Sequence, residues 1–390
     1  MAGIIALSFN MRAAITSLPP VYPELARAGI SPATEAALAA VPVLSFAVFS
    51  GSGAVLARKF GEERVLGMAL VLLAAGLGLR SLAPGVLLFP GTVVAGCAIA
   101  LMNVLLPSLV KRRMPERAGL LIGLYLMSLT AGAVLGAVIA VPVFTAAGSS
   151  EAAVRLTLGM WALPALAAGL VWLPQLRFRT IPDQAGPDAA GPPGGRGVRA
   201  MSRRALAWQV AAFTGTQSLS YYATLSWFPS LLRDHGLSAV QAGNLLALMN
   251  LGNAITGLAA PVIAHRVRDQ RPLAAAAIVM IMAGLAGVGF GPAGAATAFM
   301  LLLGLGQGGA FGLSVFFFTA RAADGPTAAS LSGFAQATGY LVAITGPLLI
   351  GFLHSATGGW AASVWVLLAV GVVQLSSGLL AGRARTISAG

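Results

Sequence analysis

The segment 29–58 reads GISPATEAALAAVPVLSFAVFSGSGAVLAR, and the segment 236–266 reads GLSAVQAGNLLALMNLGNAITGLAAPVIAHR. Both open on a Gly-Ile-Ser or Gly-Leu-Ser turn, continue with apolar residues for the length of a membrane-spanning helix, and end in a small basic loop. Many secondary transporters are built from such internal repeats of whole helices, with the substrate site at the interface of the halves. The repeat therefore predicts a carrier made of two related halves.

The composition agrees with a membrane protein. The chain is 57% hydrophobic and only 9% charged, and its mean hydropathy is +0.86, which lies far outside the range of soluble globular proteins. The net charge of +13 comes from short basic clusters between apolar spans. This pattern favours membrane orientation over nucleic-acid binding, so we expect no nucleic-acid partner. The single cysteine, Cys97, excludes a disulfide within the chain and a cysteine-based metal site.

Segments of about 20 apolar residues predict twelve spans. They are 3–26, 34–57, 65–83, 86–110, 117–146, 151–174, 205–232, 238–264, 273–290, 295–320, 326–353 and 359–382. Residues 177–204 are rich in Pro, Gly, Ala and Arg and predict a flexible linker. We therefore expect an all-α membrane protein with twelve transmembrane helices, arranged as two pseudo-symmetric six-helix bundles, 1–176 and 205–390, around this linker.

The basic residues of the loops alternate between the two sides of this scheme. Arg27, Arg155 and Arg233 fall on one side, and every other basic loop cluster falls on the opposite side. The positive-inside rule then places both termini and the linker in the cytoplasm. We expect a monomeric, multi-pass protein of the inner membrane that contacts the lipid bilayer. Apolar residues begin at Met1 and continue past the length of a signal h-region, so no cleavable signal peptide is expected.

Several segments resemble one branch of a known family. They are 10–17 (NMRAAITS), 103–107 (NVLLP) with the following 111–112 and 123–125, 266–272, 304–310 (GLGQGGA), and 333–336 with the later pair 339–340. Their sequences resemble those of the cyanate permease and 2-nitroimidazole transporter branch of the major facilitator superfamily, and the resemblance extends over nearly the whole chain. The resemblance implies two parallel six-helix bundles, alternating access, and a cyanate-like ion or a nitro-aromatic compound as the substrate.

The loop between the second and third spans departs from the superfamily's pattern, which is roughly G-x-x-x-D-R-x-G-R-[RK]. Gly61 is kept, Arg58 replaces the aspartate, and Glu62 and Glu63 stand where Arg or Lys is usual. Charges of both signs are still available for a cytoplasmic gate; a solvated loop that only orients the helices is the alternative. The predicted gate residues are Arg58, Gly61, Glu62, Arg64, Arg266 and Asp269.

Charged residues inside a span are costly and usually functional. Arg12 lies about nine residues into the first predicted span, roughly 14 Å deep and near the midplane, whereas the 11 acidic residues all fall at predicted helix ends or in loops. A guanidinium without a carboxylate at its depth favours an anion. We expect Arg12 to bind an anionic substrate; the alternative is a strut satisfied by carbonyls, glutamines or water. Arg80 is a candidate secondary charge that contacts substrate, snorkels to the interface, or pairs with Glu24.

Polar and aromatic residues lie on the spans that line the cavity in members of the superfamily. These candidate substrate-binding residues are Asn10, Thr16, Asn103, Tyr125, Ser128, Gln217, Ser220, Tyr221, Tyr222, Gln307, Gln336 and Tyr340. A few convergent donors in an apolar pocket suit a small planar ligand. Ordinary hydrogen bonding between helices explains each of them equally well.

These features predict a secondary transporter that moves a small anion by alternating access and needs no cofactor. The alternative is an efflux carrier for neutral nitro-heteroaromatic or drug-like compounds that stack on Tyr221, Tyr222 and Tyr340. An enzyme would need a carboxylate pair, a metal set or a Ser/Lys dyad at depth, and the sequence shows none, so we expect no enzymatic activity. Proton symport usually needs a titratable group within the membrane, for which Glu24 is the candidate; otherwise the protein is a uniporter or an exchanger.

The topology can be tested with reporter fusions. A reporter inserted within 186–197, or fused after Arg385, should be active only if it is a type that works in the cytoplasm, because both positions follow the basic loops. The same reporter inserted at Gly148, between the fifth and sixth spans, is the control with the opposite expectation. Periplasmic activity at either of the first two positions would overturn the orientation and the count of twelve spans.

Overall fold

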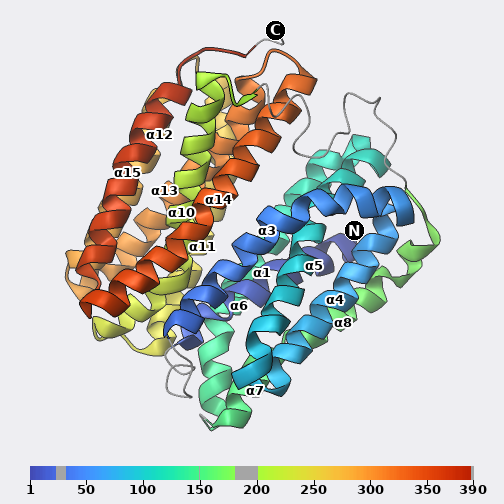
Figure 1. Ribbon diagram of the computed structural model, residues 1–390, viewed down its shortest axis with the longest axis vertical. Helices are drawn as coiled ribbons and strands as arrows, with labels where there is room; N and C mark the ends of the chain where they lie inside the picture. The colour runs from blue at the N-terminus through green and yellow to red at the C-terminus, as the bar shows by residue number, and fades with distance from the viewer. Residues whose placement is uncertain (23–31, 149, 181–200, 388–390) are drawn as a thin grey trace. The chain divides into compact units, whose positions relative to one another are not determined.

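The computed structural model describes residues 1–22, 32–148, 150–180 and 201–387, and they form helices, turns and one isolated bridge between Ala322 and Ile387 (Figure 1). The chain divides into two compact units. Unit 1 contains Met1–Ala185 with Ser238–Ala247, and unit 2 contains Gly186–Leu237 with Leu248–Gly390. The all-α architecture that the hydropathy pattern predicts is confirmed.

The helices follow the predicted spans closely. Before the linker they are α1 Ala2–Thr16, η1 Pro19–Val21, α3 Pro32–Phe60, α4 Glu62–Leu82, α5 Pro84–Arg113, η2 Pro115–Arg117, α6 Ala118–Ala146, α7 Glu151–Gly159, α8 Ala162–Trp172 and η3 Leu173–Arg177. After it they are α10 Ala205–Asp234, α11 Ala239–Arg266, α12 Arg271–Phe290, η4 Ala293–Ala295, α13 Ala296–Ala320, α14 Gly325–Thr357 and α15 Ala361–Ala381.

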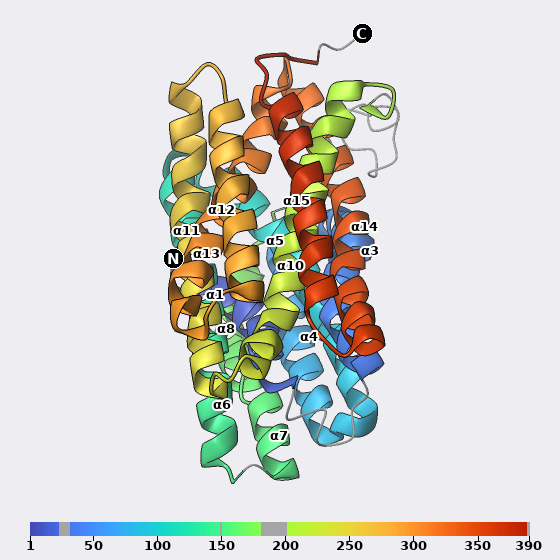
Figure 2. The ribbon, with the colours of Figure 1, turned by 90° about the vertical axis from the view of Figure 1, so that its left-hand side faces the viewer.

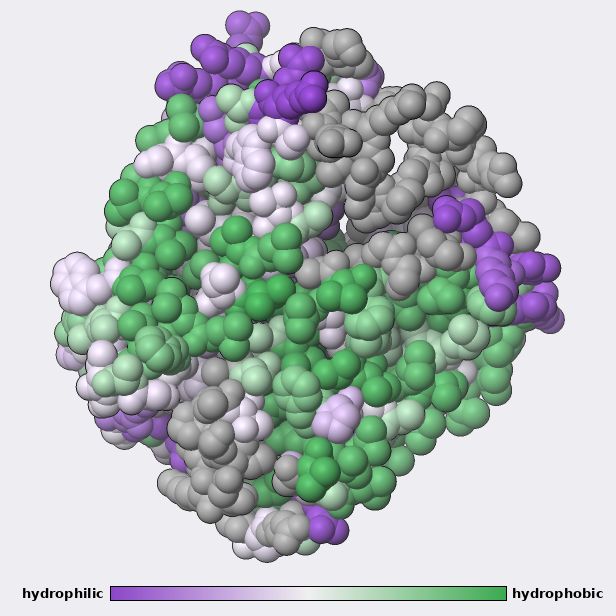
Figure 3. Space-filling view, in the orientation of Figure 1, coloured by the Kyte–Doolittle hydropathy of each residue, from purple (hydrophilic) through white to green (hydrophobic). Residues whose placement is uncertain are grey.

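Ten helical segments in the described ranges are long and apolar enough to cross a membrane. The other two predicted spans coincide with α3, whose described apolar run is Ala37–Phe46, and with α10, which is long enough but carries a row of buried polar side chains. On the face that Figure 3 shows, hydrophobic side chains cover the helix flanks and hydrophilic ones gather near the helix ends. Large apolar side chains such as Val71, Leu163 and Phe352 are exposed, as expected of flanks that contact lipid.

Two of the predicted spans are interrupted, and proline explains both corrections. The first span, predicted over 3–26, leaves the α conformation after Thr16 because Pro19 and Pro20 have no backbone N–H to continue the ladder. The sixth, predicted over 151–174, splits into α7 and α8. Pro164 cannot donate to the carbonyl of Met160, which accepts instead from the N–H of Leu163 at 3.3 Å.

The same helix pairs pack closely in both units. In unit 1, α1 packs on α6 and α4 on α5; in unit 2, the corresponding pairs are α10 on α14 and α12 on α13. Figures 1 and 2 both show α10, α14 and α15 side by side. Glycines permit the close approach: a Cβ at Gly132 of α6 would lie 2.1 Å from the Phe9 carbonyl oxygen of α1, and one at Gly346 of α14 would lie 2.7 Å from that of Leu219 of α10. The internal sequence repeat is therefore also a repeat of helix packing.

A glycine contact in unit 2 offers a test of this packing. A Cβ at Gly308 of α13 would lie 2.0 Å from the backbone oxygen of Asn253 on α11, where only a backbone shift makes room. Gly308→Ala should therefore destabilise the protein by about 1–3 kcal/mol and lower its melting temperature in detergent. Gly333→Ala is the matched control, because nothing lies within 4 Å of its added methyl group. Equal melting temperatures for the two variants would contradict the close α11–α13 contact.

Candidate functional site

Helix α1 carries three of the predicted substrate-binding residues, and their surroundings differ. Asn10 is 2% exposed, and its Nδ2 donates to the carbonyl oxygens of Ala6 at 2.8 Å and Pro164 at 3.2 Å. Thr16 is fully buried, and its hydroxyl donates to the Arg12 carbonyl at 3.0 Å. Asn10 therefore fastens α1 to α8, and the Thr16 hydroxyl bonds one turn back within α1 itself; both hydrogen bonds belong to the helix packing that the sequence left open as the alternative. Of the three, Arg12 alone keeps a partly exposed side chain.

Arg80 lies inside unit 1 with 1% of its surface exposed, so it does not snorkel to an interface. Its Nε donates to the Leu158 carbonyl and its Nη1 to the Ala14 carbonyl, both at 3.1 Å. Each carbonyl lies beside a helix interruption, Ala14 before the end of α1 and Leu158 before the end of α7. Arg80 therefore bonds backbone groups that the broken helices leave without their usual donors. Its predicted partner Glu24 lies outside the described residues.

Each unit also contains a bond between a tyrosine and an asparagine. In unit 1, the Tyr125 hydroxyl of α6 donates to Asn103 Oδ1 of α5 at 3.1 Å, so these two predicted residues lie together. In unit 2, the Tyr221 hydroxyl of α10 donates to Asn250 Oδ1 of α11 at 3.0 Å. Asn250 is 4% exposed and was missed by the sequence reasoning. An asparagine in the middle of an apolar span was the available signal.

A buried amide cluster joins α10 and α13 in unit 2. The Gln307 side chain is fully buried, and its Nε2 donates to Ser220 Oγ at 2.9 Å. Gln217 Nε2 lies 3.5 Å from both the backbone and the side-chain oxygens of Gln307, and Ser218 Oγ donates to Gln217 Oε1 at 3.3 Å. The structure thus brings Gln217, Ser220 and Gln307 together, in a cluster that is neutral throughout.

The remaining predicted residues of unit 2 lie on α10 and α14. The Tyr222 ring packs edge-on against Tyr221 with the centroids 5.3 Å apart and the planes at 74°. Gln336 of α14 is exposed, and its Nε2 donates to Ser332 Oγ one turn earlier at 2.8 Å. Tyr340 of the same helix is half-buried. The described ranges contain no group of three or more His, Cys, Asp or Glu side chains that could hold a metal ion.

The predicted gate residues of unit 1 divide between solvent and core. Arg58 and Arg64 are exposed, whereas Glu62 and Glu63 are fully buried. Gly61 joins α3 to α4 with φ +89°, a conformation that favours glycine. The Glu62 Oε1 accepts from Ser108 Oγ at 2.8 Å and lies 3.7 Å from Arg112 Nε, both on α5.

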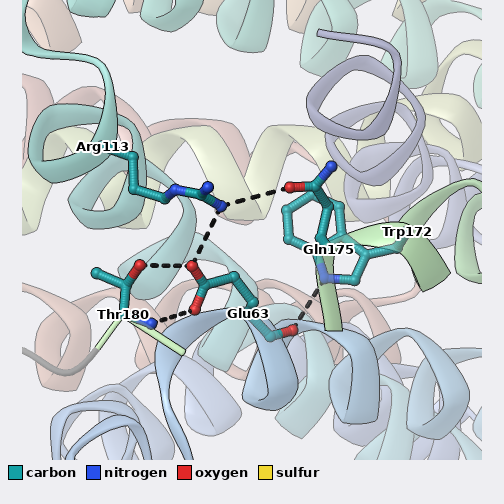
Figure 4. A network of polar contacts seen from close by, with 5 residues as sticks. All are labelled: Glu63, Arg113, Trp172, Gln175 and Thr180. Carbon is teal, nitrogen blue, oxygen red and sulfur yellow. Dashed lines mark hydrogen bonds and ion pairs between the residues drawn. The ribbon is translucent and has the colours of Figure 1, made fainter. Parts of the chain in front are cut away.

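Glu63 holds the residues that follow η3, as Figure 4 shows. The Thr180 N–H donates to Glu63 Oε2 at 2.7 Å, and the Thr180 hydroxyl donates to Oε1. Arg113 Nη1 of α5 also donates to Oε1, at 3.3 Å, and Trp172 Nε1 of α8 donates to the Glu63 carbonyl at 2.9 Å. One carboxylate therefore joins the start of α4 to the end of α5 and to the chain beyond η3.

We call residues 178–180 the strap. Besides Thr180, its Arg179 donates from Nη2 to the Lys59 carbonyl at 3.0 Å, and the Glu62 N–H donates back to the Thr180 carbonyl at 2.9 Å. The Phe178 ring lies under the Arg113 guanidinium, whose carbon is 4.1 Å from the ring centroid. The segment predicted as a flexible linker over 177–204 therefore begins with residues that are bound to unit 1.

The α11–α12 junction of unit 2 has a neutral residue, Gln270, where the α3–α4 junction has a buried carboxylate. Arg266 and Asp269 are exposed, and Asp269 pairs with Arg271 at 2.9 Å; the hydrogen bonds from Arg271 lower the pKa of the Asp269 carboxyl. Gln270 is buried and accepts from Arg321 Nη2 through Oε1. Arg321 Nε donates to the Ala381 carbonyl at 2.6 Å. Gln270 therefore takes the bridging place at this junction that Glu63 takes at the α3–α4 junction.

Comparison with known proteins agrees with this architecture. Residues 3–344 match the Major Facilitator Superfamily. The chain is 38% identical over 388 residues to the 2-nitroimidazole transporter of Escherichia coli (strain K12), covering 99% of this chain and 96% of that protein. It is 30% identical over 374 residues to the cyanate transport protein CynX of the same organism, covering 95% and 94% of the two chains.

A solved structure of the nucleoside transporter NupG is similar to this chain with a TM-score of 0.76, covering 97% of this chain and 98% of that one. Its sequence identity is 14%, so the likeness concerns the fold alone. Fold, family match and relatives agree on a twelve-helix membrane transport protein and not an enzyme. The chain belongs to the Major Facilitator Superfamily.

Proposed function

We propose that the protein is a secondary transporter of a small planar anion, with Arg12 as the main charge that binds it. The observation that carries this proposal is the half-buried guanidinium in the middle of α1. That helix contains no acidic residue, and its other predicted polar residues, Asn10 and Thr16, are used for packing. Arg12 is therefore the residue of α1 whose planar set of hydrogen-bond donors can bind a ligand.

The ligands named for two relatives support a small substrate. Cyanate and 2-nitroimidazole are both small, and each presents oxygen and nitrogen acceptors. We infer that the buried groups of α10 recognise the uncharged part of such a ligand, or position the residues that do. They are neutral donors and acceptors, together with the Tyr221 and Tyr222 rings.

A second candidate function is export of neutral nitro-heteroaromatic compounds. The 38% identity to a 2-nitroimidazole transporter favours it, and so does the aromatic pair of α10. In that case Arg12 would serve as a strut, and binding would depend on stacking and on amide donors.

We further propose that transport proceeds by alternating access in the inner membrane, with both termini in the cytoplasm, and that the strap takes part in the cytoplasmic gate. Support comes from the burial of Glu62 and Glu63 at the α3–α4 junction, where the exposed Arg58 and Arg64 remain available for other contacts. Breaking Glu63's bonds to Thr180 and Arg113 would weaken the attachment of the strap and of the end of α5 to α4. In unit 2, the exposed Arg266 and Asp269 are the corresponding candidates.

The role of Arg12 can be tested in proteoliposomes. Removing a charged hydrogen-bond donor costs about 1.5–3 kcal/mol, so Arg12→Ala should lower cyanate uptake at least about tenfold. Arg12→Lys should also be impaired if the planar fork of donors matters. The exposed Arg155 of α7 provides the control Arg155→Ala, which should transport like the wild type.

Uptake of 2-nitroimidazole by the same variants separates the two candidate functions. If Arg12→Ala transports both compounds at the wild-type rate, the proposed anion site at Arg12 is contradicted and neutral-compound export is favoured. If the wild type transports 2-nitroimidazole but not cyanate, the substrate class must be revised.

The strap can be tested by limited proteolysis. Glu63→Gln removes the charge that Arg113 meets and weakens the acceptors that hold Thr180. We expect stability to fall by about 1–3 kcal/mol and trypsin to cleave after Arg179 faster than in the wild type. Glu116→Gln changes an exposed acid on η2 and is the control. Unchanged cleavage after Arg179 in Glu63→Gln would show that Glu63 does not hold the strap.

A further inference from the structure

Arg80 is a full charge enclosed in unit 1. Its side chain is 1% exposed, and its two described hydrogen bonds go to backbone carbonyls, which carry no net charge. Its Nη2 is buried and has no hydrogen-bond partner among the described residues. A buried charge is costly, so its retention indicates a use for the charge itself.

The position of Arg80 links it to Arg12. Arg80 Nη1 bonds the carbonyl of Ala14, which lies two residues beyond Arg12 on α1 and so about 3 Å further along the helix axis. The Arg80 guanidinium, which reaches α1 from α4, therefore lies within about one helical turn of the Arg12 backbone along the axis. The hydrogen bonds of Arg80 leave its positive charge in place, so this part of unit 1 has a positive potential.

We propose that Arg80 determines charge specificity: without touching the ligand, it strengthens binding of an anion at Arg12 and favours anionic over neutral ligands of the same shape. This inference rests on the proposed function, in which Arg12 binds the substrate. Coulomb's law gives the scale of such an effect: at an effective dielectric constant of about 20, a unit charge strengthens the binding of an anion roughly tenfold when the two are about 10 Å apart. A neutral ligand gains little from the same charge.

A strut that only bonds carbonyls makes a different prediction. If Arg80 only bonds the carbonyls at the helix interruptions, replacing it should weaken the binding of anionic and neutral ligands alike, since both depend on the position of α1. If its charge is used, the ratio of the two affinities changes. The ratio is therefore the measurement that separates specificity from structure.

The test uses benzoate and benzamide, which share a planar shape and differ in charge, as inhibitors of labelled 2-nitroimidazole uptake into proteoliposomes. We expect the wild type to bind benzoate more tightly than benzamide. Arg80→Gln should lower that preference about tenfold, whereas Arg80→Lys, which keeps the charge, should preserve it even if overall uptake falls. Size-exclusion profiles of the purified variants report on folding.

A second pair of variants leaves Arg80 in place. Ser81 lies beside the Arg80 site, because a Cβ at Gly159, next to Leu158, would be 2.8 Å from Ser81 Oγ. Ser81→Asp places a negative charge there, and Ser81→Asn is the control of the same size. The aspartate should lower the benzoate preference and the asparagine should not. This pair decides the question if Arg80→Gln does not fold.

The outcomes separate this inference from the function on which it rests. A wild-type preference for benzoate that survives both Arg80→Gln and Ser81→Asp overturns the role of Arg80 and leaves the anion transporter standing. Equal loss of the preference in Arg80→Lys and Arg80→Gln would also overturn the role of the Arg80 charge, because the lysine keeps that charge. A wild type that takes up 2-nitroimidazole but shows no preference for benzoate removes the anion site, and the charge specificity with it.

Discussion

Inside a bilayer no water is available to the backbone, so every carbonyl and N–H group must find its partner within the protein. Where the first and sixth spans are interrupted, the carbonyls of Ala14 and Leu158 lack the backbone N–H donors that an unbroken helix would supply. One side chain, Arg80, repairs both with two hydrogen bonds of 3.1 Å. The broken shape of α1, and with it the position of Arg12, depends on this repair. An arginine suits the task because its donors are spread over a rigid plane and can reach two separate helices.

The two halves share their packing and differ in their chemistry. Corresponding helix pairs approach closely at glycines in both units, as at Gly132 in α6 and Gly346 in α14. The polar interior has diverged, however. Unit 1 buries the charges of Arg80, Glu62 and Glu63. Unit 2 buries the charge of Arg321 near its α11–α12 junction, and its α10–α13 contact holds amides and hydroxyls around Gln307. Helix packing requires small residues at fixed spacing, and the identity of the polar groups is left free for function.

Hydropathy and helix length were sufficient to predict the all-helical architecture and its spans, because these properties depend on the bilayer more than on neighbouring side chains. The partners of Arg80 were not predictable, since they are backbone carbonyls exposed by helix breaks, and carbonyls carry no side-chain signature. The burial of Glu63 was missed for a related reason. A glutamate at this position looks in the sequence like a residue of a solvated loop, and its partners Arg113 and Thr180 lie far away in the sequence. Gln217 and Gln307 were each recognised as candidate residues because each is a long polar side chain within an apolar helix; the structure brings them together.

The strap changes where the first half of the protein ends. By sequence composition the domain stops before Arg177, yet the α3–α4 junction is completed by Thr180, whose carbonyl and N–H groups both bond the start of α4. For protein engineering, this changes the position at which the chain can be divided into halves. A split transporter expressed as two polypeptides, or a chimaera that exchanges halves between relatives, would need its junction beyond Thr180. Cut earlier, the first polypeptide would leave Glu63 without its two hydrogen bonds from Thr180, and it would lack Arg179, which covers Gly61.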